Sequence, residues 1–87
     1  MSIPPALKDA LRELRRVRAM RPDESADPVG FAYWRLDMAD CLDELARHVL
    51  YDADRERAAV EAAEARRVAA RTLEAHGHRS VIRENLA

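Results

Sequence analysis

Apolar residues recur at intervals of three or four along most of the chain, which is the spacing of one face of an α-helix. Pro4 and Pro5 fit a helix entrance, because their missing N–H groups fall among the donors left unbonded there, and Pro22 fits a helix end. We therefore predict a first helix over about residues 4–20 and a polar connection over 21–27. The apolar stripe of this helix consists of Leu7, Ala10, Leu11, Leu14 and Val17.

A second stripe follows Asp27-Pro28, a pair typical of a helix start, because Asp accepts hydrogen bonds from the first turn and Pro needs no acceptor there. We predict a second helix over 28–51 that packs antiparallel to the first, with the large apolar side chains of both as the core. Its main stripe consists of Phe31, Trp34, Met38, Leu42, Leu45 and Val49, with Cys41 at the edge. A weaker apolar flank of the same helix consists of Leu36, Ala39, Ala46 and Leu50.

Small residues form the stripe of the third segment, at the alternating four- and three-residue spacing of a coiled-coil seam. This alanine seam consists of Ala58, Ala62, Ala65, Ala69 and Thr72, with Leu73 alongside. Gly77 follows the last periodic residue and fits the position just after a helix end. We predict an alanine-rich helix over 54–76 and a short C-terminal tail over 78–87.

The second stripe and the alanine seam point about 150° apart at 100° per residue, and no Gly or Pro separates them. Two arrangements are open: a break near residues 52–54, where an Asp caps a third helix, or one long helix that buries two faces against two partners. The first helix covers only half of such a long helix. We therefore expect an all-α helical hairpin with an alanine-rich third segment, self-associating as a homodimer or higher oligomer into a helical bundle. The predicted self-association residues are Ala58, Ala62, Ala65, Ala69 and Leu73.

The net charge is only −1, but the charges are segregated along the chain. Residues 1–21 carry six basic and two acidic side chains, whereas residues 22–54 carry two basic and nine acidic ones. One face of the second predicted helix combines these carboxylates with tyrosines. A solvated outer face explains it, and so does a docking strip for a basic partner helix, since Tyr is enriched in interface cores and charged groups belong to their rims. The predicted partner-binding residues are Tyr33, Asp37, Asp40, Glu44 and Tyr51.

Basic side chains of the first helix raise a second function class, an accessory protein that binds nucleic acid through phosphate contacts. The candidate residues are Lys8, Arg12, Arg15, Arg16 and Arg18. No aromatic side chain or Asn interleaves with them to read bases, the chain contains no Gln, and the next helix is strongly acidic. Nucleic acid is therefore the weaker of the two partner classes.

The remaining composition restricts the chemistry. Cys41 is the only cysteine, so no disulfide can form within the chain and a reducing compartment is expected. The three serines lie near predicted helix starts or in the connection, and no glycine-rich loop is present to hold a phosphate. No apolar run approaches the roughly 20 residues of a membrane span. The ratio of 14 Arg to one Lys is typical of a GC-rich bacterial genome.

These observations favour a small cytoplasmic protein that presents helical faces to a protein partner, such as an adaptor, an inhibitor or an antitoxin-like regulator. We expect no enzyme activity, no cofactor and no metal site, and no association with membranes.

Overall fold

The computed structural model describes residues 3–77, and this part of the chain forms three helices and no strand. The helices are α1 (Pro5–Ala19), α2 (Pro28–Ala46) and α3 (Asp52–Ala75). The all-α prediction is confirmed for these residues. The predicted tail over 78–87 lies outside the described residues.

Local sequence determines where α2 begins. The Oδ1 atom of Asp27 accepts a hydrogen bond from the Gly30 backbone N–H at 2.9 Å, which satisfies one of the donors that a helix start leaves unbonded. Gly30 leaves room for this cap, because a Cβ atom built there would collide with the Asp27 carboxylate. Pro28 occupies the first helical position, as the sequence predicts.

Arg21 fastens the connection between α1 and α2. Its guanidinium carbon lies 5.2 Å from the ring centre of Phe31 and 5.7 Å from that of Trp34, within the range of a cation–π contact. Arg35 covers the same Phe31 ring at 4.8 Å. The polar connection is thus held against the aromatic start of α2 by its first residue.

The structure resolves the two arrangements that the opposed stripes leave open: the chain turns between α2 and α3. The second helix ends at Ala46, five residues before the predicted end, and the backbone is non-helical over 47–51. Arg55 holds this turn, with Nε donating to the Ala46 carbonyl and a terminal nitrogen donating to the Val49 carbonyl, each at 3.2 Å. A side chain from the next helix therefore satisfies the last carbonyl of α2 and one carbonyl of the turn.

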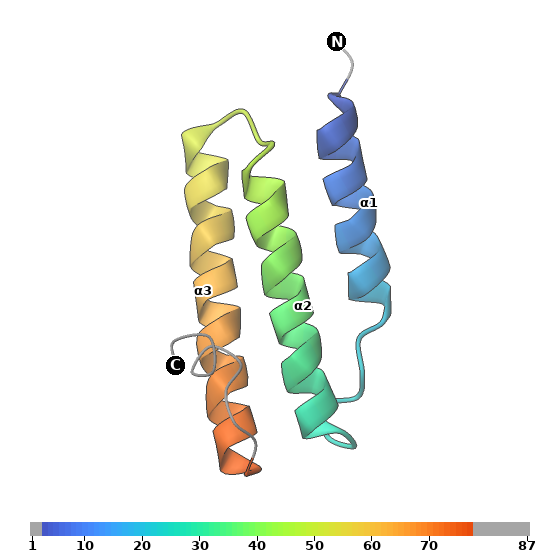
Figure 1. Ribbon diagram of the computed structural model, residues 1–87, viewed down its shortest axis with the longest axis vertical. Coiled ribbons are helices and arrows are strands. Elements are labelled where there is room, and N and C mark those ends of the chain that lie inside the picture. Colours follow the sequence, from blue (N-terminus) through green and yellow to red (C-terminus); the bar gives the residue numbers. More distant parts are fainter. Residues whose placement is uncertain (1–2, 78–87) are drawn as a thin grey trace.

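The three helices form an open layer with α2 in the middle (Figure 1). Each helix runs antiparallel to the next, so α1 and α3 flank α2 in the same direction. More of the α2 backbone lies close to α3 than to α1, and α1 and α3 scarcely touch. The radius of gyration is 14.3 Å, against about 12 Å for a compact chain of this length, as expected when the flanking helices do not close into a bundle.

Two clusters of apolar side chains hold α2 to its neighbours. The cluster facing α1 consists of Leu14, Val17 and Cys41, with Trp34, Met38, Leu42 and Leu45 packed against them. The cluster facing α3 consists of Ala32, Ala69 and Leu73, with Val29 and Leu36 packed against them. Most of the main stripe predicted for the second helix thus packs toward α1, but Val49 lies in the turn after α2. Of the predicted flank, Leu36 packs toward α3 and Ala39 is buried, whereas Leu50 lies in the same turn and is 73% exposed.

The alanine seam is covered within the chain, which corrects the premise of the self-association prediction. Ala58, Ala62, Ala69 and Leu73 are buried, and Ala65 is half-buried. Because the turn over 47–51 re-aims α3, the two opposed stripes both meet partners in the same molecule. The geometric reason for expecting a second copy at the seam is thereby removed, and self-association itself stays a prediction.

Candidate partner-binding groove

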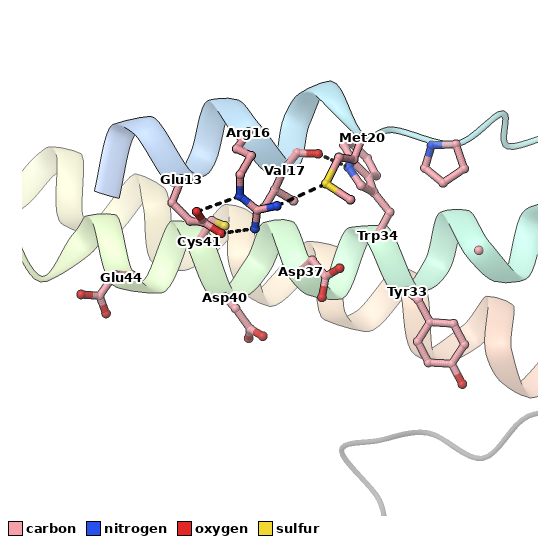
Figure 2. Close-up of a pocket in the computed structure, with 12 residues that line it drawn as sticks. Glu13, Arg16, Val17, Met20, Tyr33, Trp34, Asp37, Asp40, Cys41 and Glu44 are labelled. Carbon is pink, nitrogen blue, oxygen red and sulfur yellow. Dashed lines mark hydrogen bonds and ion pairs between the residues drawn. The ribbon is translucent and has the colours of Figure 1, made fainter. Parts of the chain in front are cut away.

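An elongated groove of about 580 Å³ runs between α1 and α2 on one face of the layer (Figure 2). We call it the α1/α2 groove. Its floor is formed by apolar side chains of both helices, and its two walls carry charged groups. The groove exists because α1 packs against only one side of α2 and no other described helix covers the gap between them.

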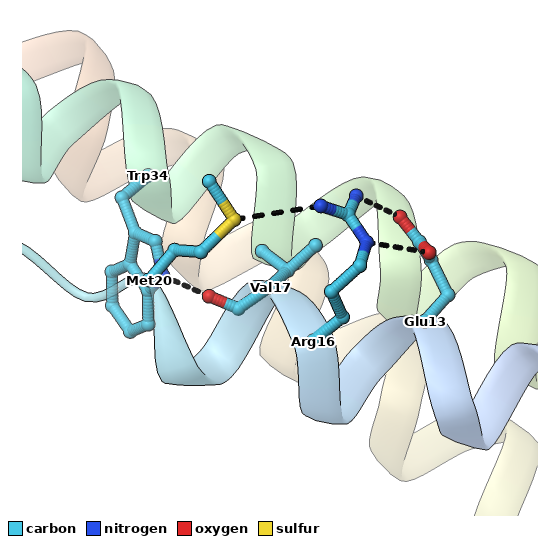
Figure 3. Close-up of polar contacts among 5 residues, drawn as sticks. All are labelled: Glu13, Arg16, Val17, Met20 and Trp34. Atoms are coloured by element: carbon cyan, nitrogen blue, oxygen red, sulfur yellow. Dashed lines mark hydrogen bonds and ion pairs between the residues drawn. The ribbon is translucent and has the colours of Figure 1, made fainter.

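Trp34 sets the floor of the α1/α2 groove. Its indole Nε1–H donates to the Val17 carbonyl at 2.7 Å, which satisfies the polar edge of the ring near the end of α1 (Figure 3). The ring centre lies 5.2 Å from that of Phe31, and Val17 and Cys41 are buried. Met20 stands at the open end of the floor with 63% of its surface exposed. The floor therefore combines a fixed aromatic anchor with one flexible exposed side chain.

The α1 wall is an ion pair. The Nε of Arg16 donates to Glu13 at 3.0 Å, a terminal nitrogen makes a second contact with the same carboxylate, and another lies 3.5 Å from the Met20 sulfur (Figure 3). The hydrogen bond from Arg16 lowers the pKa of Glu13, and the same contact raises the pKa of Arg16. Both groups remain charged near neutral pH, and Arg16 is engaged on its own helix.

The α2 wall contains four of the five predicted partner-binding residues. Tyr33, Asp37, Asp40 and Glu44 all line the α1/α2 groove, so the structure brings them together as the helical spacing predicts (Figure 2). Glu44 also contacts Nε2 of His48 at 3.0 Å. The sequence analysis did not foresee that these residues would face a groove, because that depends on where α1 packs.

Tyr51 does not belong to this wall, which corrects the fifth predicted residue. It lies in the turn before α3 and is 70% exposed. The prediction assumed helical spacing as far as residue 51, but α2 ends at Ala46, so Tyr51 leaves the helical face that carries the other four.

Arg66 reaches across from α3 to the outer side of the α2 wall. One of its terminal nitrogens lies 2.6 Å from an Asp43 oxygen and 2.8 Å from an Asp40 oxygen. The contact with Asp43 is the main cause of a raised Arg66 pKa. The ion pair between Arg66 and Asp40 joins residues 26 positions apart, so the spacing of residues along the chain does not predict it.

Cys41 is a poor nucleophile in this setting. Burial raises the pKa of its thiol, and the nearby carboxylates of Glu13, Asp37 and Asp40 raise it further, whereas Arg16 lowers it only slightly. The thiolate is the reactive form, so a neutral buried thiol favours a packing role.

The structure divides the predicted nucleic-acid residues. All five are exposed, but Arg16 lies in the α1/α2 groove beside carboxylates and the other four do not line it. Arg12 lies 3.6 Å from the Asp9 carboxylate. The buried residues of α1 face α2, so the exposed basic groups lie along the rest of its surface.

Other site types find no support within residues 3–77. There, no three His, Cys, Asp or Glu side chains are grouped so that they could hold a metal ion. None of the helices in this range has both the length and the apolar character to cross a membrane. The chain matches no protein-family model, no curated protein and no solved structure. The α1/α2 groove therefore carries the functional argument.

Proposed function

We propose that the protein is a small intracellular interaction module, an adaptor, inhibitor or antitoxin-like regulator that binds another protein in the α1/α2 groove and performs no chemistry itself. One observation carries the proposal: an elongated open groove with an apolar floor and charged walls. Apolar surface surrounded by polar groups is the usual anatomy of a protein-binding patch.

The residues of the groove suit binding better than catalysis. Its one thiol has a raised pKa, and its one guanidinium is engaged with Glu13. The half-buried Trp34 and the exposed Tyr33 are of the residue types that dominate binding energy in interfaces.

Site-specific photo-crosslinking in the native host tests this proposal. A photoreactive benzoylphenylalanine replaces Tyr33 in the groove or, as the matched control, Val60, which is 67% exposed on α3. We expect a defined adduct from position 33 only, and we expect excess untagged wild-type protein to suppress it. The same bands from both positions, or none from position 33, would contradict the proposal.

A second candidate is nucleic-acid binding by the exposed basic side chains of α1. The observation that favours it is that Lys8, Arg12, Arg15 and Arg18 remain exposed in the folded chain. Reversal of Arg12 and Arg15 to Glu would then abolish a salt-dependent shift of labelled DNA. No shift of the wild-type protein at low salt removes this candidate.

A further inference from the structure

We infer that the partner segment held in the α1/α2 groove is a basic amphipathic helix, which lies along α1 and α2 with its apolar side on the Trp34 floor. This inference rests on the proposed function and specifies the chemistry of the partner. Three features of the groove support it separately: the charge of its lining, the spacing of its wall carboxylates and its apolar floor.

The charge of the lining selects a basic partner. Four carboxylates and one guanidinium line the groove, which gives a formal charge of −3: Glu13, Asp37, Asp40 and Glu44 against Arg16. Arg16 is hydrogen-bonded to Glu13 on its own helix, so it does not pair with the α2 wall. Within that wall Asp40 contacts Arg66, and Glu44 contacts Arg47 and His48, but the residues that line the groove keep a net negative charge. An acidic segment would meet like charges here, whereas Lys or Arg side chains would complement the wall.

The spacing of the wall selects a helix. Asp37, Asp40 and Glu44 follow one another by three and four residues, so α2 offers about one carboxylate per turn. From Tyr33 to Glu44 the wall extends about 16 Å at 1.5 Å per residue, which matches three turns of a partner helix. The described residues contain no strand to which an extended peptide could add.

The floor selects an apolar stripe on that helix. Met20 is exposed, and its flexible thioether adapts to different apolar side chains. Tyr33, 40% exposed, stands on the α2 side. A Leu-type side chain on each turn of the partner would cover this surface and remove it from water.

Synthetic peptides without aromatic residues test the inference. Three 14-residue peptides, each labelled with fluorescein, are titrated with the full chain: one with a Leu stripe flanked by Lys, one with the same stripe flanked by Glu, and one with Lys but Ala in place of Leu. Anisotropy measures binding, and the emission of Trp34, the only tryptophan, reports whether the groove is occupied. We expect saturable binding and a Trp34 change with the Leu-Lys peptide alone. No binding of it, or equal binding of either other peptide, overturns the inference.

A pair of double variants locates the binding. Asp37→Asn with Glu44→Gln removes two charges from the groove, and Glu56→Gln with Glu61→Gln removes two from exposed positions on α3. Asp40 is left intact because it pairs with Arg66. We expect the first variant to weaken the Leu-Lys peptide at least tenfold and the control less than twofold, with both retaining the wild-type circular dichroism. Equal weakening in the two variants overturns the inference.

The crosslinking experiment separates this inference from the proposed function. If the adduct at position 33 maps by mass spectrometry to an acidic or non-helical segment, or to a second copy of this chain, the inference fails and binding in the groove stands. If position 33 forms no adduct while the Leu-Lys peptide binds as expected, the proposed cellular role fails and the chemistry of the groove stands. If position 33 forms no adduct and the Leu-Lys peptide does not bind, the proposed function and the inference both fail.

Discussion

The central helix α2 packs against its two neighbours in different ways. Toward α3 the buried cluster combines two alanines, Ala32 and Ala69, with Leu73, and Ala69 is completely buried. Toward α1 the cluster is made of large side chains, among them Leu14, Val17 and Trp34. Small side chains let helix backbones approach over a long contact, whereas α1 contacts α2 less extensively and leaves a groove along one side. The α3 interface is thus the more extensive one, and the α1 interface leaves an open groove, in which we propose that a partner binds.

The largest effect is expected from a charge in the alanine interface. Ala62→Glu places a carboxylate at a site that is 1% exposed, which we expect to cost at least about 3 kcal/mol and to unfold much of the population. Ala63→Glu, at the exposed neighbouring residue, is the control and should cost less than about 0.5 kcal/mol. Urea unfolding followed by circular dichroism measures both.

A different result would revive the self-association surface. If Ala62→Glu stays as stable as Ala63→Glu but loses mass in light scattering, the alanine seam is a contact between copies and the intramolecular packing described above is wrong.

Truncation of one leucine in each interface sharpens the comparison. Leu73 is 1% exposed and packs with Ala32 and Ala69, so we expect Leu73→Ala to cost about 3–5 kcal/mol. Leu14 is 7% exposed in the less extensive α1 interface, and Leu14→Ala should cost about 2–3 kcal/mol. Leu50→Ala, at a 73% exposed site, is the control and should have almost no effect. A larger loss for Leu14 than for Leu73 would reverse the proposed ranking of the interfaces.

Trp34→Phe tests the anchor of the α1/α2 groove. It removes the hydrogen bond to the Val17 carbonyl and part of the ring volume, for an expected loss of about 1–2 kcal/mol. Tyr51→Phe, at an exposed position, should leave the free energy of unfolding unchanged. Urea unfolding by circular dichroism gives both values, and equal stability of the two variants would show that the indole does not fasten α1.

The smallest effect concerns the thiol of the α1 interface. Because burial and nearby carboxylates raise the pKa of Cys41, the folded chain favours the neutral thiol. The resulting stability is fully present below the unfolded pKa of about 8.5 and is lost as pH rises through the folded pKa. We expect the free energy of unfolding to fall above about pH 8.5 in the wild type and to fall less steeply in Cys41→Ala. Identical slopes in the two proteins would contradict this.

Much of the fold follows from local signals in the chain. Periodic apolar stripes predict three helical segments, and Asp27-Pro28 predicts the start of α2 at the residue where it begins. The turn after Ala46 carries no Gly or Pro to announce it, and Arg55 from the following helix holds it. For this reason the end of α2 was predicted five residues too late, and Tyr51 was assigned to the wrong surface.

The sequence by itself determined the helices, their apolar faces and the shared helical face of Tyr33 with the carboxylates Asp37, Asp40 and Glu44. Helical periodicity and capping depend only on neighbours within a few positions. Only the tertiary structure decided that the alanine seam packs on α2 of the same chain and that the acidic face borders a groove. The turn over 47–51 directs the alanine seam onto α2, the packing of α1 turns the acidic face into one wall of a groove, and Arg66 reaches Asp40 from another helix. These outcomes depend on contacts between residues far apart in the chain, for which the linear pattern of apolar and polar positions holds no information.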